Sequence, residues 1–193
     1  MKACSTLEMA LLGLVAQKPQ SGYDLRKTFA TTAMRHYSDS PGSIYPALRR
    51  IEARGWIETT AAKGDLADPR RKQDYRLTDA GKKVLIAWLE LPVGAEDVRT
   101  RQAELMLRFA FMDGNVPRVT TIQFLDQFTR ELAIYAAESR TKWTQMRDLI
   151  AKARPGRNPI HTGLLAFESG IEGMEAQIRW ARKVRTELME DSQ

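Results

Sequence analysis

Residues 40–58 read SPGSIYPALRRIEARGWIE and decide the fold of the first half of the chain. Ser40 can cap a helix, Pro41 suits a first helical position, and Gly55 is typical of a helix end. Between these signals the apolar residues recur at helical spacing, at Ile44, Leu48 and Ile51. The stretch therefore predicts one short helix that buries a single stripe of apolar side chains.

The face outside that stripe has the composition of a DNA-reading helix. It carries small and aromatic residues at its leading end and two guanidinium groups behind them: Ser43, Tyr45, Pro46, Arg49 and Arg50. Slim residues let a helix enter a major groove, and the cations behind them can meet phosphate. A half-buried packing role for Tyr45 is the open alternative. Because proline is tolerated best in a first helical turn, Pro46 predicts that the regular helix begins nearer Ser43 than Pro41.

Composition and charge are those of a folded protein with a basic first half. The chain has 193 residues, 43% of them hydrophobic and 28% charged, which allows one large or two small domains. Residues 1–90 carry 15 Lys/Arg against 10 Asp/Glu, and residues 91–193 carry 15 against 14, so most of the net charge of +6 lies in the first half. This split is typical of a polyanion-binding module joined to a partner module, although many solvated surfaces are equally basic. The single cysteine, Cys4, excludes an internal disulfide. The sequence has neither a secretory signal nor a membrane-length apolar run, so we expect a cytoplasmic protein.

Two further helices precede the one described above. Apolar spacing over residues 6–15 predicts the first. Ser21 followed by Asp24 resembles a capping box and predicts the start of the second, on which Tyr23 and Lys27 are candidate DNA contacts. The three helices together predict a helix-turn-helix.

A wing is expected after the third helix. The β-branched and aromatic residues at 56–60 and 75–78 predict a hairpin with a long polar loop. That loop carries cations suited to a phosphate backbone or a minor groove, at Lys63, Arg70, Arg71 and Lys72. A fourth helix is expected to run from Thr78 to Leu89. Residues 1–91 are thus predicted to be a winged helix-turn-helix domain, within a mainly α (α+β) chain.

The second half predicts a helical domain over residues 98–190. Pro92, Gly94 and the acidic pair Glu96-Asp97 predict a short linker before it, and the apolar segment 104–112 should be buried. Apolar spacing predicts a long helix over residues 122–153 and a second long helix over residues 164–188, which would form an antiparallel hairpin. Because a hairpin is too thin to cover both of its apolar sides, we expect a homodimer. Each of the two long helices carries one apolar stripe, which we call its seam. The contacts of the dimer are predicted along the seam of the second helix, at Leu164, Phe167, Ile171, Met174, Ile178 and Ala181.

Three spaced motifs resemble the PadR family of transcriptional regulators. They are SGYDL at residues 21–25, GSIYPAL at residues 42–48, and YRLT at residues 75–78 followed by Ala80-Gly81. The resemblance implies a winged-helix homodimer that binds a double-stranded DNA operator, usually as a repressor, and that a small effector such as a phenolic or other aromatic compound releases. Members of the family respond to phenolic acids or to drugs, and these residues select neither. Gln73-Asp74 departs from the family, which often has an aliphatic or aromatic residue beside the tyrosine.

An enzyme and a protein-binding adaptor are the alternatives to a DNA-binding regulator. An enzyme would need clustered titratable side chains, and His36 and His161 are isolated, so we expect no catalytic site, no metal and no cofactor. A winged-helix adaptor that binds proteins instead of DNA is the alternative. The arginines at 49, 50 and 71 argue against it, because such adaptors lose the basic residues of the recognition face.

Overall fold

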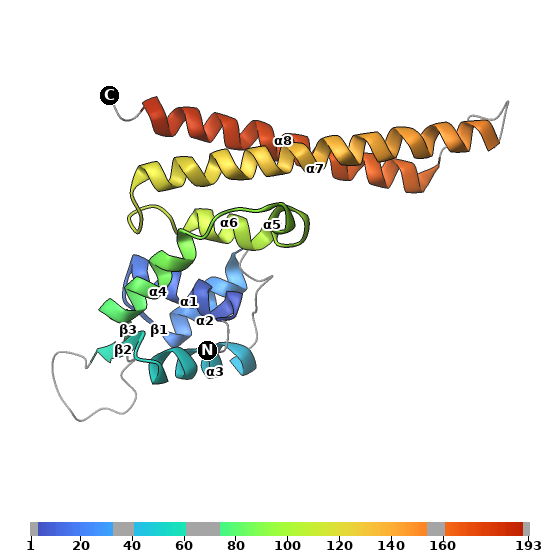
Figure 1. Cartoon of the computed structure of the whole chain (residues 1–193). Coiled ribbons are helices and arrows are strands. Elements are labelled where there is room, and N and C mark those ends of the chain that lie inside the picture. The colour runs from blue at the N-terminus through green and yellow to red at the C-terminus, as the bar shows by residue number, and fades with distance from the viewer. Residues whose placement is uncertain (1–3, 33–40, 61–73, 154–160, 191–193) are drawn as a thin grey trace. The chain divides into compact units, whose positions relative to one another are not determined.

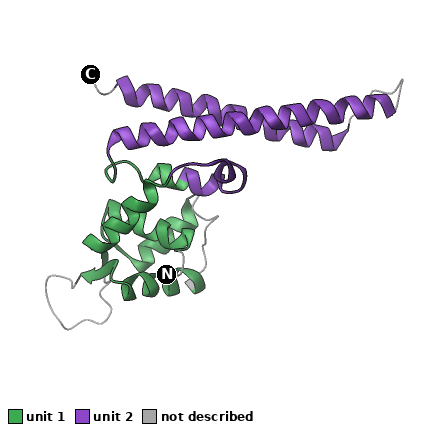
Figure 2. Cartoon of the chain, viewed as in Figure 1, with its two compact units in different colours: residues 1–91, 107–116 green, residues 92–106, 117–193 purple. Residues whose placement is uncertain are grey.

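The computed structural model describes residues 4–32, 41–60, 74–153 and 161–190, and the chain divides into two compact units (Figure 2). The first consists of residues 1–91 with 107–116, and the second of residues 92–106 with 117–193. The predicted domains, 1–91 and 98–190, were consecutive, whereas the contacts place the segment 107–116 in the first unit. Among the described helices, none is long and apolar enough to cross a membrane.

The first unit is a winged helix-turn-helix, as predicted. Its elements are α1 (Thr6–Gln17), β1 (Gln20–Ser21), α2 (Gly22–Thr31), α3 (Pro41–Ala53), β2 (Ile57–Thr60), β3 (Asp74–Leu77) and α4 (Asp79–Leu89) (Figure 1). The strands form an antiparallel sheet in the order β1-β3-β2, in which Ile57 pairs with Leu77 and Gln20 pairs with Tyr75. Strand β1 was not predicted, because two residues are too few to show a strand period.

Side-chain caps begin three of these helices. Ser5 and Glu8 form a capping box at α1, the hydroxyl of Ser21 accepts from the backbone N–H of Asp24 at α2, and the hydroxyl of Thr78 caps α4. Each cap satisfies a backbone donor that has no partner within its helix, which fixes where the helix starts.

The start of α3 differs from the prediction. The helix begins at Pro41 and contains Pro46 in its interior, so the expectation that it begins nearer Ser43 was wrong. Pro46 offers no N–H to the carbonyl four residues earlier, which would destabilise an isolated helix. Burial compensates here, because Ile44, Leu48 and Ile51 are fully buried in the unit.

Residues 107–116 complete the core of the first unit. Phe111 is buried, and its ring lies directly against Gly13 of α1, where the Cβ of any larger residue would collide with it. The predicted burial of the segment 104–112 is confirmed for Leu105, Leu107 and Met112, whereas Ala110 is exposed.

The second unit begins with a helix where a linker was predicted. Its elements are α5 (Ala95–Thr100), the start of α6 (Gln102–Ala110), α7 (Arg118–Ala153) and α8 (Thr162–Glu190). The linker prediction was wrong because Gly94 and Asp97 do not interrupt a helix but begin one. The Asp97 carboxylate accepts a hydrogen bond from the Gly94 N–H at 2.8 Å at the start of α5.

Helices α7 and α8 form the predicted antiparallel hairpin (Figure 1). The Trp143 indole N–H donates to the Leu164 carbonyl at 3.1 Å, and Arg140 pairs with Glu175 at 2.7 Å. Side chains of both predicted seams are buried in the single chain, including Leu125, Leu132, Ala136, Leu164, Ile171, Met174, Ile178 and Ala181. The seams therefore hold the hairpin itself together.

Candidate nucleic-acid interface

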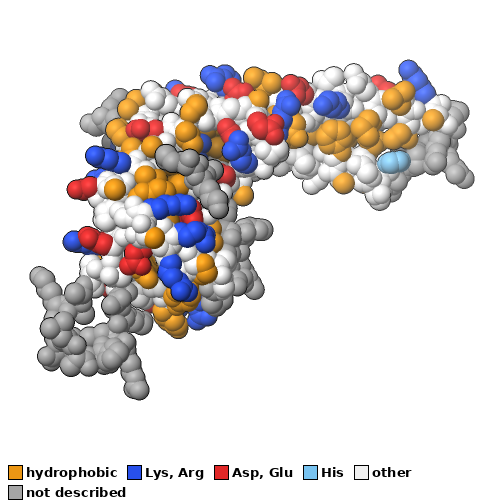
Figure 3. All heavy atoms as spheres, turned by 60° about the horizontal axis from the view of Figure 1, so that its bottom comes forward, with side chains coloured by type: hydrophobic (Ala, Val, Ile, Leu, Met, Phe, Trp, Pro, Cys, Tyr) orange, Lys and Arg blue, Asp and Glu red, His pale blue; other side chains and the backbone are white. Residues whose placement is uncertain are grey.

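The outer face of α3 presents the side chains that the sequence singled out. Ile44, Ala47, Leu48 and Ile51 are fully buried, which turns the opposite side of the helix to solvent. On that side Arg49 and Arg50 are exposed, Tyr45 is 38% exposed, and Ser43 and Pro46 are half-buried. Figure 3 brings this side of the first unit toward the viewer and shows Lys and Arg side chains interleaved with hydrophobic ones.

Tyr45 has a packing contact as well as an open side. Its ring lies against Gly22 at the start of α2, where a Cβ would stand 2.9 Å from the Tyr45 Cε1 atom. The glycine thus leaves room for the ring, which joins α2 to α3. Part of the Tyr45 side chain therefore packs against α2, and part is exposed.

Arg49 and Arg50 differ although they are neighbours on one helix. The Arg50 Nε lies 2.7 Å from Glu8 Oε1, and Arg54 Nη1 lies 3.0 Å from Glu8 Oε2. Arg49 forms no ion pair with any residue that the structure describes. Arg50 was predicted as a DNA contact on the same footing as Arg49, and the structure gives its guanidinium an internal partner that Arg49 does not share.

Glu8 supports the candidate interface from beneath and was not predicted as a site residue. Only 3% of it is exposed, and it connects α1 to the last turn of α3 through Arg50 and to the turn that follows α3 through Arg54. Burial alone would raise the pKa of the Glu8 carboxyl. The hydrogen bonds from Arg50, the Ser5 backbone and Arg54 outweigh that effect and hold the pKa below its ordinary value. The signal was present, because Ser5 and Glu8 stand at the spacing of a capping box.

The base of the wing lies beside α3. Burial raises the pKa of the Tyr75 hydroxyl, as do the nearby Glu52 and Tyr45 of α3, while Arg49 opposes them. Arg76 pairs across the hairpin with Glu58 at 2.6 Å. Asp74, where the sequence departs from the family pattern, is an ordinary strand residue whose carbonyl accepts from the Thr60 hydroxyl at 3.0 Å.

The remaining predicted contacts are two residues of α2 and four cations of the predicted wing loop. Tyr23 is 50% exposed with the Arg26 guanidinium 5.5 Å from its ring centroid, and Lys27 is exposed. The cations Lys63, Arg70, Arg71 and Lys72 fall outside the described residues. Within the described part of the chain, no three His, Cys, Asp or Glu side chains are placed to hold a metal ion.

Comparison with known proteins identifies the family. The profile described as "Transcriptional regulator PadR-like family" matches residues 11–87, which span the winged helix. The negative transcriptional regulator PadR of Bacillus subtilis (strain 168) is 30% identical over 132 residues, which cover 66% of this chain and 68% of that protein. The chain belongs to the PadR-like family of transcriptional regulators. The family resemblance seen in the three sequence motifs is thereby confirmed.

Solved structures of PadR-like regulators align with nearly the whole chain. Bacillus subtilis PadR in complex with operator DNA is 23% identical, with 95% of this chain and 99% of that chain covered and a TM-score of 0.39. The same regulator in complex with p-coumaric acid is 21% identical, with 97% and 98% covered and a TM-score of 0.40.

Proposed function

We propose that this PadR-like regulator is a homodimeric, sequence-specific DNA-binding repressor that acts in the cytoplasm and leaves its operator when a small aromatic effector binds. The observation that carries the proposal is the outer face of α3. Tyr45 and Arg49 project from a helix whose opposite side is fully buried, so the helix can enter a major groove without disturbing its core.

The contacts with DNA would divide between base edges and phosphate. Ser43, Tyr45 and Pro46 form the slim leading end of α3 and would face the bases. Arg49 and Lys27 would meet phosphates, as would the wing cations. Arg50 would serve mainly to hold α3, because its guanidinium is engaged by Glu8.

Repression and effector control are supported by the Bacillus subtilis relative. That protein is a negative regulator, and its structure is known with p-coumaric acid. A phenolic compound is therefore the first effector to test on this chain.

Dimerisation is proposed through exposed apolar side chains of the hairpin. Of the six predicted contact residues, five are buried within one chain and Phe167 is half-buried, so a partner would meet the side chains that flank them. Leu149 is 66% exposed, Leu165 52% and Met146 45%, all near the end of α7 or the start of α8. Figure 3 shows hydrophobic side chains running along this part of the hairpin beside its single described histidine. Such a surface is typical of a protein contact.

Binding to DNA from upstream of the chain's own gene tests the proposal, because such regulators commonly control themselves. We expect a labelled upstream duplex to bind at least about 10³-fold more tightly than a shuffled duplex of equal length. Light scattering should give a dimer, and p-coumaric acid should lower operator affinity. Equal affinity for both duplexes would refute sequence-specific binding, and binding to neither would favour the adaptor alternative.

A further inference from the structure

Gly22, the first residue of α2, lies against the ring of Tyr45 on α3. A Cβ built at Gly22 would stand 2.9 Å from the Tyr45 Cε1 atom, which is closer than carbon atoms approach in a folded protein. The ring can therefore occupy its place only because this position has no side chain. We infer that Gly22 is a positioning residue for sequence recognition, which sets where the Tyr45 ring meets the operator. The inference rests on the proposed function, in which Tyr45 faces the bases.

The backbone at Gly22 does not itself require glycine. Among the described glycines, only Gly55 and Gly114 have a positive φ, the conformation in which glycine is favoured. Gly22 belongs to a helix, where alanine is the more stabilising residue. The nearest atom outside Tyr45, the Cδ1 of Leu48, would lie 3.5 Å from the added Cβ, which is an ordinary van der Waals contact. The room that the glycine leaves thus serves the Tyr45 ring.

The start of α2 is held in place, so an added side chain there would move the ring and not the helix. The Ser21 hydroxyl caps α2, and Gln20 pairs in the sheet with Tyr75 of β3. The Gln20 Nε2 also donates to the Leu14 carbonyl of α1 at 2.8 Å. Tyr45, in contrast, is 38% exposed, and its ring is the end of a side chain that can turn toward solvent.

A displaced ring would change base recognition more than phosphate contacts. Ile44 and Leu48 are fully buried and hold α3 in place, so Arg49 would keep its position when the Tyr45 ring moves. Contacts to base edges depend on where individual atoms lie, whereas contacts to phosphate carry no sequence information directly. Gly22 should therefore affect the discrimination between sequences and leave general DNA affinity unchanged.

Gly22→Ala in the full chain tests the inference, with affinities measured on the upstream operator duplex and on a shuffled duplex of equal length. Operator affinity should fall at least about fivefold, because a base contact is misplaced. Affinity for the shuffled duplex and the salt dependence should stay the same, because the phosphate contacts are retained. The thermal midpoint should stay within about 4 °C of the wild type, since alanine favours the helix while the ring loses a contact.

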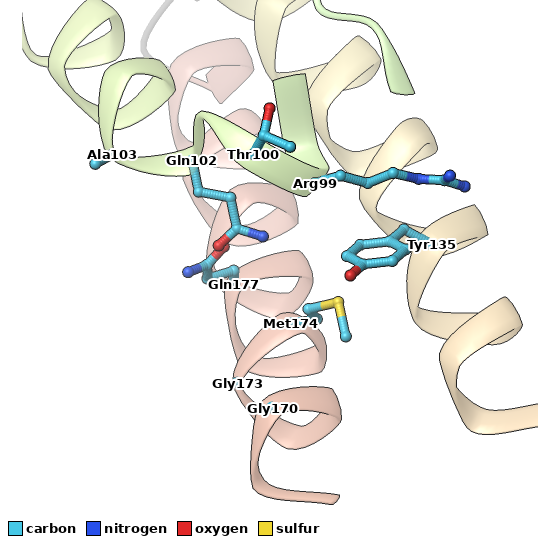
Figure 4. A pocket seen from close by; sticks show the side chains of 9 residues that line it. All are labelled: Arg99, Thr100, Gln102, Ala103, Tyr135, Gly170, Gly173, Met174 and Gln177. Carbon is cyan, nitrogen blue, oxygen red and sulfur yellow. The ribbon is translucent and has the colours of Figure 1, made fainter. Parts of the chain in front are cut away.

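Two further variants separate the Tyr45 ring from other causes. Gly170→Ala adds the same Cβ to a glycine of α8 that lines an open pocket of the second unit (Figure 4). The Cβ would meet no atom within 4 Å there, so this variant should bind the operator like the wild type. In a Tyr45→Ala background, Gly22→Ala should cost no further operator affinity, because the ring that it displaces is gone. The losses of the two single variants should thus not add.

Several results would overturn the inference and leave the repressor proposal intact. An operator affinity of Gly22→Ala equal to that of the wild type would show that the place of the ring does not matter. Equal losses on both duplexes would indicate that the DNA backbone itself approaches the glycine. Losses that add in the double variant would mean that Gly22 acts without Tyr45, and a thermal loss beyond about 4 °C would indicate a packing role.

Failure of the proposed function would look different. The wild type would then bind the upstream and the shuffled duplex with equal affinity, and the inference would fall with it. An operator-specific wild type whose Gly22→Ala variant keeps that specificity would refute the role of Gly22 alone.

Discussion

Arg49 and Arg50 are adjacent on α3, and we expect opposite consequences when each is changed to alanine. Arg49 is exposed and forms no ion pair with a described residue, whereas Arg50 bonds to the buried Glu8. Arg49→Ala should therefore lower DNA affinity and leave stability almost unchanged. Arg50→Ala should lower the stability of the winged helix and change the electrostatic part of DNA binding little.

The structure sets the expected magnitudes. A hydrogen bond to a charged group contributes about 1.5–3 kcal/mol. Because the Arg50 side chain is 50% exposed, solvent screening reduces its contribution to about 1 kcal/mol. In a domain of this size that loss lowers the thermal midpoint by about 4–8 °C. Arg49→Ala should stay within about 0.5 kcal/mol of the wild type. Loss of one phosphate contact should reduce the slope of log affinity against log salt by about 0.9.

Thermal midpoints and operator affinities between about 50 and 200 mM salt would measure both effects. Glu8→Gln is the matched control, since it weakens the same contact from the other side and should share the thermal loss of Arg50→Ala. The reasoning would be refuted if Arg50→Ala kept the wild-type midpoint and lost the salt slope, because Arg50 would then be a phosphate contact.

Three further outcomes are expected. Leu48→Ala should cost about 3 kcal/mol of stability. Tyr45→Ala removes a half-exposed ring that packs on α2, so it should cost about 1 kcal/mol and reduce operator binding far more than non-specific binding. Equal thermal losses would show that Tyr45 is a core residue. The folded-state pKa of Glu8 lies below its unfolded value. The stability that the ionised Glu8 contributes is therefore complete above about pH 4.5 and is lost as the pH falls through the folded pKa. The thermal midpoint of the wild type should accordingly fall more steeply than that of Glu8→Gln between about pH 5 and 3. Leu165→Glu should yield a folded monomer in light scattering, because Leu165 is exposed on the proposed contact surface. Ile171→Glu should unfold the hairpin, because the Ile171 side chain is fully buried. A dimer of Leu165→Glu would mean that the partner subunit binds another face.

Most elements of the winged helix could be predicted from local signals. The stripe of α3, the caps at Ser21 and Thr78 and the hairpin strands each follow from side chains within a few residues of one another. The predicted start of α3 was wrong because burial of Ile44 and Leu48 stabilises a helical turn that the low helix propensity of Pro46 disfavours. Tertiary packing outweighs intrinsic helix propensity at such positions.

The pairing of charges could not be predicted in the same way. Glu8 and Arg50 are separated by 42 residues, and no periodicity in the sequence brings them together. The same limit applies to the hairpin seams: their spacing predicts two apolar helix faces but does not say whether each faces the other helix or a second subunit. In the structure Ile171 and Ala181 are fully buried inside one chain.

The sequence by itself determined the helices and hairpin strands of the winged helix, the two long helices of the hairpin, the buried stripe of α3 and the family, because these depend on local spacing and on short motifs. The tertiary structure alone decided that Arg50 pairs with Glu8 and where residues 107–116 pack. Each of these depends on contacts between residues far apart in the chain. The free energy of such contacts is set by distance and burial in the folded molecule, which no local pattern encodes.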